Sequence, residues 1–412
     1  MSLTTSHADT VIVGAGAAGL MAAIWAGRMH PEKRIVLLDG ACKLGAKILV
    51  AGGGRCNVTH HTVDPGRYAG SSTAAIAKVL RRFDVPETVE FFRELGVELK
   101  QEDTGKLFPT TDRARDVLDA LLTGVRRAGV SLHHPCRVEE VELSEAGFTV
   151  RGPWGAMACN KLVLATGGKS LPRSGSDGKG LAFARALGHS VTRTFPSLVP
   201  LILAPGNPIL DLSGVTLPAT LQLHTSTGKH VIAFTNSTLC THFGLSGPSV
   251  LDISRYFLDL QNTDPGAYLT VNWLPGVASS TLDAALQSLG PVPVRKYLRR
   301  HLPHRMVDTL LLLCGLDPAT KGDALSRKLR RQLVMAVTAQ RLDVEGNRGY
   351  RYAEVTAGGV PLRELDLKRL ESRVVPGLFL CGEICDVDGP IGGLNFQWAW
   401  SSGFVVGCSV GC

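Results

Sequence analysis

The sequence has 412 residues, of which 44% are hydrophobic and 19% are charged, and its formal net charge is +8. A chain of this length and composition is expected to form two or three well-buried globular parts. No apolar run reaches the roughly 18 residues of a membrane-spanning helix, and the first nine residues lack the basic start and apolar stretch of a secretory signal. These features argue against a membrane span and predict a cytoplasmic protein.

The sequence contains ten cysteines, scattered along the chain. Without an export signal they are expected to be reduced thiols. Cys381 and Cys385 share a C-x-x-x-C spacing, as do Cys408 and Cys412, whereas zinc and redox sites usually use C-x-x-C. No histidine completes a ligand set nearby, so no metal site is predicted.

The N-terminal segment carries the pattern of a dinucleotide-binding unit. TVIV at 10–13 predicts a buried strand, GAGAAG at 14–19 a turn that opens a helix, and RIVLLD at 34–39 a second strand ending in an acid. This order is typical of a dinucleotide-binding βαβ unit. A glycine turn in an unrelated α/β protein is the alternative, and the motif alone does not distinguish FAD from NAD.

The residues of this unit have different expected roles. Gly14 permits the tight turn, Gly16 lets the backbone approach a pyrophosphate, and Gly19 lets the helix pack against the strand. Free N–H groups at the start of the helix would bind the phosphates. Asp39 is placed to accept hydrogen bonds from ribose hydroxyls, which disfavours a cofactor with a 2′-phosphate.

Two internal segments favour FAD over NAD. KILVAGGGRCNVTH at 47–60 is a second glycine-rich loop, which a larger cofactor would need for backbone access, although an ordinary surface loop is the alternative. KLVLATGG at 161–168 is an apolar strand that returns the chain to the cofactor edge of the sheet. Before it, residues 136–152 alternate as antiparallel strands do, and Val138 suits a backbone contact with adenine.

The last of these segments is GEICDVDGPIGGLNFQWAWSSG at 382–403, after a short apolar strand at 377–380. Its acids are expected to hold ribityl hydroxyls, whereas the backbone of Gly392, Gly393 and the next helix turn would face the flavin. The two ends of the chain must then meet in space. A glycine-rich loop before a core helix is the alternative.

The middle of the chain interrupts the flavin-binding unit. Strands are expected in VPLILA, ATLQLHT, KHVIAFT and AYLTVNWLP, and helices over most of 280–340. We therefore predict an α/β fold in which a Rossmann-like FAD-binding domain is interrupted by a β-rich unit and a helical subdomain. The expected boundaries are 1–194 with 346–412 for the FAD-binding domain, 195–279 for an antiparallel or barrel-like domain, and 280–345 for a basic helical subdomain.

The order of these motifs identifies a family. GAGAAG, KILVAGGGRCNVT, ATGG, AEVTAGGV at 353–360 and the C-terminal stretch follow one another, and THFGLSGPSVL lies at 241–251. With them the chain resembles the HI0933-like flavoproteins, also called the aminoacetone-oxidase or BaiN-like family of NAD(P)/FAD-dependent oxidoreductases, over nearly its full length. The resemblance implies a bound FAD and a two-dinucleotide-binding type of Rossmann domain split by an insertion.

The flavin would carry the hydride chemistry, and protein groups would orient and tune it. Cys56, Asn57, His242 and Asn395 are the candidates for a catalytic role. A packed thiol is the alternative for Cys56, and a structural histidine is the alternative for His242. The expected cofactor-binding residues are Gly14, Gly16, Ala17, Ala18, Gly19, Asp39, Gly40, Lys47, Gly52, Gly53, Gly54, Arg55, Cys56, Asn57, Val138, Thr166, Gly167, Gly168, Gly382, Glu383, Asp386, Gly392, Gly393, Asn395 and Phe396.

Two function classes remain open at this point. The first is an FAD-dependent oxidoreductase of a small organic substrate, with NAD(P)H docking transiently because no second GxGxxG unit is present. The second is a flavoprotein that binds or modifies RNA. Ten Lys and Arg oppose three Asp between 295 and 331, a local net charge of +7. Few aromatic residues interleave with them, so a solvated helical face is the plainer interpretation of this segment.

Overall fold

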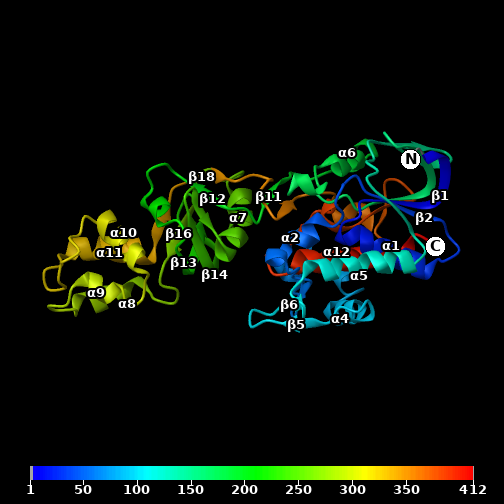
Figure 1. The fold of residues 1–412 in the computed structure, drawn as a ribbon. Coiled ribbons are helices and arrows are strands. Elements are labelled where there is room, and N and C mark those ends of the chain that lie inside the picture. Colours follow the sequence, from blue (N-terminus) through cyan, green and yellow to red (C-terminus); the bar gives the residue numbers. More distant parts are fainter. Residues whose placement is uncertain (1–2, 412) are drawn as a thin grey trace. The chain divides into compact units, whose positions relative to one another are not determined.

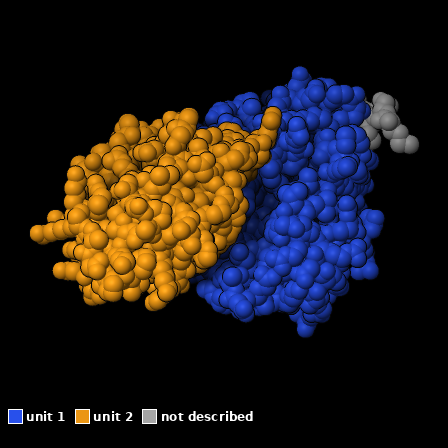
Figure 2. Space-filling model, turned by 60° about the vertical axis from the view of Figure 1, so that its left-hand side comes forward, with its two compact units in different colours: residues 1–196, 354–412 blue, residues 197–353 orange. Residues whose placement is uncertain are grey.

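The computed structural model describes the backbone of residues 3–411 and the side chains from residue 7 onward. Two compact units make up the chain (Figure 2). The first contains Met1–Pro196 and Glu354–Cys412, and the second contains Ser197–Ala353. No helix between residues 3 and 411 combines the length and the apolar composition that a membrane span requires.

The first unit is built on a sheet whose five central strands are parallel. Their order is β22-β10-β1-β2-β7. β1 and β10 are therefore neighbours in the sheet, although they lie far apart in the sequence. Strands buried on both faces need continuous apolar runs, and Ile12, Leu37, Val163 and Phe379 are fully buried. The bounds are β1 Leu3–Val13, β2 Ile35–Leu38, β7 Ser131–His133, β10 Gly155–Leu164 and β22 Leu378–Leu380.

Shorter antiparallel strands extend this sheet. β21 Glu371–Ser372 joins β22 at one edge, and β20 Leu365–Asp366 joins β21. β9 Gly147–Gly152 pairs with the first half of β10, and β8 Glu140–Ser144 pairs with β9, as the alternation at 136–152 predicts. The fold is therefore the α/β Rossmann-like class that the sequence indicates.

The two ends of the chain pack directly against each other. Helix α1 Ala17–Met29 lies beside helix α12 Leu394–Ser409 (Figure 1), and α5 Ala114–Arg127 also contacts α1. Two glycines of α12 allow this close approach. A Cβ placed on Gly403 would lie 2.6 Å from the carbonyl oxygen of Ala18, and one on Gly407 would lie 2.7 Å from that of Ala22.

The remaining elements of the first unit are short and surround the sheet. β4 pairs with β23, so residues 69–70 and 387–388 meet, and β3, β6 and β5 form a small antiparallel sheet. Their bounds are α2 Ala46–Gly54, β3 Thr59–His60, β4 Ala69–Gly70, α3 Thr73–Leu80, α4 Val85–Glu94, β5 Leu99–Gln101, β6 Lys106–Pro109, α6 Lys179–Ala186, β11 Phe195–Ser197, β19 Val355–Ala357 and β23 Val387–Asp388.

The second unit contains a seven-stranded antiparallel sheet in the order β17-β16-β13-β14-β15-β12-β18. Helix α7 Pro248–Leu260, which the sequence analysis does not anticipate, packs on β13 and β14. The strand bounds are β12 Leu201–Leu203, β13 Thr216–His224, β14 His230–Thr241, β15 Gly244–Ser246, β16 Tyr268–Asn272, β17 Gln340–Leu342 and β18 Val344–Asn347.

Four further helices of this unit gather beyond the β16–β17 edge (Figure 1). They are α8 Ser279–Gln287, α9 Val294–Leu298, α10 His304–Leu313 and α11 Arg327–Thr338. Residues of the sheet such as Val271 and Trp273 and residues of the helices such as Leu298 and Leu333 share one hydrophobic core. The structure thus joins the expected β-rich part at 195–279 and helical part at 280–345 in a single unit.

Candidate functional site

A cavity of about 580 Å³ lies in the first unit, at the carboxyl ends of β1, β2 and β10. The glycine-rich loop after β2 and the start of α12 complete its wall. Its volume falls in the roughly 300–1,000 Å³ range of small-molecule sites. Open α/β sheets bind ligands at this edge, next to the point where the strand order reverses.

The turn after β1 forms one end of the cavity. Gly14 has φ of 107°, and a Cβ there would lie 2.4 Å from the carbonyl oxygen of Ala165. Gly19 packs against the same turn, since its Cβ would lie 1.7 Å from the Gly14 oxygen. Gly16 faces open space, with no atom within 4 Å of a Cβ placed on it. No acid stands in the first turn of α1, so its N–H groups are suited to an anion.

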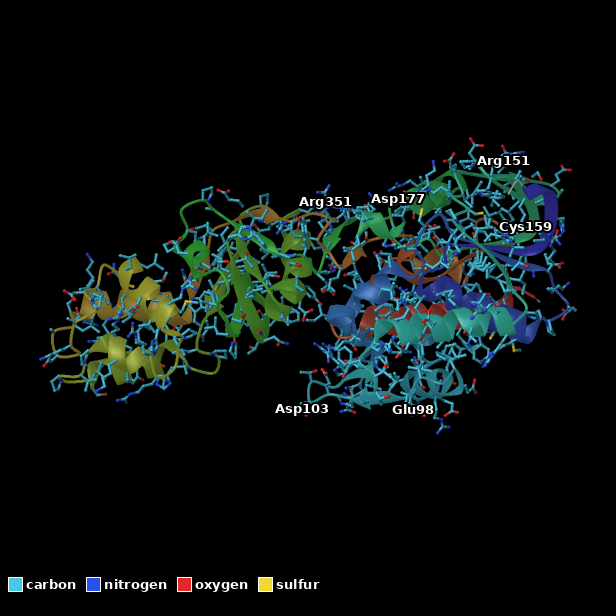
Figure 3. The ribbon with its side chains drawn as sticks, viewed as in Figure 1. Glu98, Asp103, Arg151, Cys159, Asp177 and Arg351 are labelled. Carbon is cyan, nitrogen blue, oxygen red and sulfur yellow. The ribbon has the colours of Figure 1, made fainter. Side chains whose placement is uncertain are left out.

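Asp39 organises the adjacent part of the wall. One carboxylate oxygen accepts the N–H of Ala15 at 2.6 Å, and the other accepts the N–H of Ala41 at 2.7 Å. These bonds hold the acid at the end of β2, where it lines the cavity. Arg137, whose Cδ would lie 2.7 Å from a Cβ on the neighbouring Gly40, pairs with Asp177. Asp177 lies just before α6 and is labelled in Figure 3.

The glycine-rich loop bends sharply where it meets the cavity. Gly52, Gly53 and Gly54 have φ of 58°, 70° and 87°, which breaks the end of α2. Arg55 follows them, and its guanidinium donates to Glu102 at 2.6 Å. The same group lies 4.1 Å from the ring centre of Phe108, which also lines the cavity. A second carboxylate, that of Asp112, lies 3.6 Å from the same guanidinium, so the charge of Arg55 is compensated and its position is fixed.

The C-terminal turn supplies the facing wall. Glu383 pairs with Lys47 at 2.6 Å and accepts the N–H of Thr356 at 2.9 Å. Gly392 and Gly393 have φ of 113° and 96° and lead into the first turn of α12. A Cβ on Gly393 would lie 2.6 Å from the carbonyl carbon of Thr59, so the turn packs directly against the backbone of β3.

A buried polar network fixes the start of α12. Gln397 accepts the hydroxyl of Thr59 at 2.6 Å and donates to the carbonyl oxygen of Phe83 at 3.0 Å. The indole N–H of Trp400 donates to the carbonyl oxygen of Val58 at 2.8 Å, and that of Trp398 to the carbonyl oxygen of Gly382 at 3.0 Å. Such satisfied networks specify one arrangement of the elements they join.

Comparison with known proteins agrees with this architecture. The family model described as "HI0933-like protein Rossmann domain" matches residues 8–409. The ribosomal RNA dihydrouridine synthase of Escherichia coli is 36% identical over 96% of this chain and 96% of its own. The 3-dehydro-bile acid delta(4,6)-reductase of Clostridium scindens is 33% identical over 96% of this chain and 97% of its own.

The chain belongs to the HI0933-like family. The E. coli quinol fumarate reductase shares the fold, with a TM-score of 0.52 at 15% identity over 99% of this chain and 70% of that chain. As an HI0933-like protein the chain is an enzyme of the FAD-dependent oxidoreductase class.

The cavity of this HI0933-like protein fits an FAD by its unpaired polar atoms. The side-chain oxygens of Asn57, Thr166 and Ser174 are buried and have no hydrogen-bond partner among the described residues, and all three residues line the cavity. Buried polar groups are rarely left unpaired, since each costs roughly 1–3 kcal/mol. Their concentration around one cavity points to a polar ligand that completes them.

Most of the residues expected to bind the cofactor come together here. Those that line the cavity are Gly14, Gly16, Ala17, Ala18, Asp39, Gly40, Lys47, Gly52, Gly53, Arg55, Asn57, Val138, Thr166, Gly167, Gly382, Glu383, Gly392, Gly393, Asn395 and Phe396. Gly19, Gly54, Cys56, Gly168 and Asp386 are not part of its wall. Gly19 and Gly168 instead allow close packing, since a Cβ on Gly168 would lie 2.5 Å from the side-chain hydroxyl oxygen of Thr356.

Three of the residues predicted to be catalytic have well-defined surroundings in the structure. Cys56 is fully buried, and burial raises the pKa of its thiol to about 12, so it is a packed neutral thiol rather than a reactant facing the cavity. The Asn395 amide accepts the N–H of Gly389 at 2.9 Å and donates to its oxygen at 2.7 Å, which makes it a positioning residue of the turn. His242 is exposed and belongs to the second unit.

The structure also brings in residues that the sequence analysis omits. Lys106, Phe108, Ser174 and Asp177 line the cavity. Lys106 has no carboxylate partner among the described residues, and its Cε would lie 3.7 Å from a Cβ on Gly392. Lys106 reaches the site from β6, which pairs with β3, a strand distant in sequence. The only sequence signal for this placement is a lysine directly before the buried Leu107 and Phe108.

Replacing Thr166 by valine should separate stability from cofactor binding. Thr166→Val keeps the shape of the side chain but removes an unpaired buried hydroxyl. We expect the apo-protein to be as stable as the wild type or more stable by about 1 kcal/mol, and FAD to bind about tenfold more weakly. Urea unfolding of the apo-protein and FAD titration measure the two effects. Loss of stability without loss of affinity would show that the hydroxyl serves the fold alone.

Proposed function

We propose that this enzyme reduces a carbon–carbon double bond conjugated to a carbonyl group, and that its substrate is a uridine of ribosomal RNA. The observation that carries the proposal is the 36% identity, over 96% of both chains, to a relative named ribosomal RNA dihydrouridine synthase. Dihydrouridine differs from uridine by two hydrogens across the ring double bond beside a carbonyl. The name of the bile acid relative describes the same kind of bond in a ketone.

The reaction needs a hydride at one carbon, a proton at the other, and stabilisation of negative charge on the conjugated oxygen. When bound, FAD supplies the hydride transfer, with NADH or NADPH as the two-electron donor. Lys106, which has no carboxylate partner among the described residues, places positive charge on the cavity wall, where a fixed cation stabilises an enolate-like oxygen. Arg55 is held by Glu102 and Asp112 and lies over Phe108, so its N–H groups are oriented before the substrate enters.

The chain's remaining cavity groups would hold the cofactor. Asp39 suits the ribose hydroxyls at one end of the site, and the first turn of α1 suits the pyrophosphate. Lys47 and Glu383 carry opposite charges beside each other, so they can bind hydroxyl and phosphate groups along the middle of the cofactor. The first turn of α12 would face the flavin ring.

A small conjugated ketone is the second candidate substrate. The bile acid reductase is nearly as similar to this chain as the RNA enzyme, at 33% identity over 96% of the chain. The two candidates share the bond to be reduced and differ in the rest of the substrate, so one assay series can compare them directly.

The test incubates the full-length FAD-loaded protein with unmodified ribosomal RNA and NADH or NADPH, digests the RNA to nucleosides, and measures dihydrouridine by mass spectrometry. We expect dihydrouridine only when enzyme and donor are both present. Parallel reactions contain a steroid dienone in place of RNA. Reduction of the dienone without dihydrouridine would select the second candidate, and oxidation of the donor with neither product would contradict both.

A further inference from the structure

We propose that the surface formed by exposed cations of α9, of α11 and of the segments just after α9 and just before α11 binds the phosphate backbone of the RNA, an inference that rests on the proposed function. We call this surface the cationic face. It consists of six exposed side chains, Lys296, Arg300, Lys321, Arg327, Lys328 and Arg331. None of them has an acidic partner among the described residues. The proposal concerns the second unit alone.

Two acids of this region form ion pairs, whereas Asp317 and Asp323 are exposed and form no ion pair among the described residues. Asp308 forms ion pairs with Arg295 at 2.8 Å and with Arg299 at 2.9 Å. Asp283 on α8 forms an ion pair with Arg330 at 2.9 Å. These pairs lock the helices to one another and use the cations that face inward. The six cations of the cationic face outnumber the two unpaired acids, Asp317 and Asp323, by four. Uncompensated exposed charge of one sign is an electrostatic footprint for a polyanion.

The fold brings part of this charge together, because the segment before α11 pairs with the start of α9. Pro293 at the start of α9 forms a β-bridge with Lys321, and the N–H of Val294 donates to the carbonyl oxygen of Thr320 at 3.0 Å. The segment before α11 therefore runs alongside the start of α9. On α11 the cations at 327, 328 and 331 stand opposite the buried Leu333 and Val337.

Two aromatic rings lie next to the charges of α9 and of the residues that follow it. Tyr297 and His301 lie edge to face at 5.4 Å and alternate in sequence with Lys296 and Arg300. Two rings among six cations are few for base stacking, so the expected contacts are mainly between Lys and Arg side chains and RNA phosphates. An anionic membrane would instead use exposed apolar side chains, and Leu312 and Met335 are 75% and 52% exposed nearby in sequence. Lipid binding is therefore an outcome that the test must distinguish.

The experiment reverses charge on the cationic face of the full-length holoprotein. One variant combines Arg327→Glu, Lys328→Glu and Arg331→Glu. Its control combines Lys78→Glu, Arg82→Glu and Arg126→Glu, which make the same charge change on exposed side chains of the first unit. The affinity for a ribosomal RNA fragment is measured by fluorescence anisotropy at several salt concentrations. Co-sedimentation with vesicles of anionic and of neutral lipid is measured in parallel.

We expect the variant to bind RNA at least tenfold more weakly than the control and its salt slope to fall by about 2, since each phosphate on a single strand contributes about 0.7. Flavin content and reduction of the flavin by dithionite should match the wild type. Equal RNA binding and equal salt slopes in variant and control would overturn the inference. So would binding of the wild type to anionic vesicles but not to RNA.

Failure of the inference and failure of the proposed function give different results. If the wild type forms dihydrouridine and the variant does so equally well at low RNA concentration, the cationic face is not the RNA site and the function stands. If the wild type forms no dihydrouridine and binds no RNA, both fail. Weaker dihydrouridine formation by the variant on long RNA, without change on a uridine-containing trinucleotide, supports the inference.

Discussion

A Gly16→Ala variant is expected to fold normally and to lose FAD. A Cβ at this position meets no protein atom within 4 Å, but it projects into the cavity in the turn between β1 and α1. There it would occupy the space through which the backbone reaches a pyrophosphate. We expect the FAD affinity to fall about 100-fold, or roughly 2.7 kcal/mol, and the apo-protein to lose at most about 1 kcal/mol from the change of N-cap residue.

Gly19→Ala is the matched comparison for this experiment. Its Cβ would lie 1.7 Å from the Gly14 oxygen. This variant should therefore lower the stability of the apo-protein, because the new atom meets the protein rather than the cofactor. Thermal unfolding of the two apo-proteins and FAD titration of both separate the two roles. Full FAD affinity in a folded Gly16→Ala protein would mean that the cofactor does not cross this turn.

A Gly403→Val variant should destabilise the first unit by about 2–3 kcal/mol, as overpacking of a tight interface does. The new side chain would meet the backbone oxygen of Ala18 at 2.6 Å and the Cβ of Met21 at 2.8 Å, which forces α12 away from α1. Because α12 and α1 both border the cavity, weaker FAD binding should accompany the lower stability. Urea unfolding followed by circular dichroism and FAD titration measures both.

Gly346→Val provides the control for this second variant. Gly346 lies in β18 of the second unit, and a Cβ there meets no atom within 4 Å. It should leave flavin binding unchanged. An equally stable Gly403→Val protein with full flavin content would show that the two ends of the chain do not need this contact.

The fold of the first unit was predictable because its signals are local. A buried strand, a glycine turn, a helix and a strand ending in Asp39 follow one another within about 30 residues, and each step has its own periodicity or turn chemistry. The pairing of the chain ends was predictable from chemistry, because the glycine turn before α12 can face the flavin only if it lies close to the glycine turn after β1. The family and the α/β fold class are confirmed.

The direction of individual side chains was not predictable from the same signals. Asp386 and Asn395 lie in the expected C-terminal turn, yet Asp386 is absent from the cavity wall and the Asn395 amide is taken up by Gly389. Cys56 has φ of 62°, which belongs to the sharp bend of the loop and accompanies a side chain buried away from the cavity. Sequence patterns specify which segment reaches a site, but backbone dihedral angles decide which atoms face it.

Contributions from distant segments were also hidden in the sequence. Lys106 and Phe108 reach the cavity because β6 pairs with β3, and Ser174 does so from a loop after β10. In the second unit, α7 and the shared core of strands and helices depend on long-range packing. No local period marks such contacts, so they appear only when the chain is folded.

The most direct test of the account is the flavin content of the purified full-length protein. If both chain ends enclose one FAD, the purified protein should be yellow and show the two visible bands of an oxidised flavin. It should release FAD in equimolar amount on denaturation. The Gly16→Ala protein purified in parallel should be colourless and folded. A folded wild-type protein that is colourless and takes up no added FAD would contradict the account.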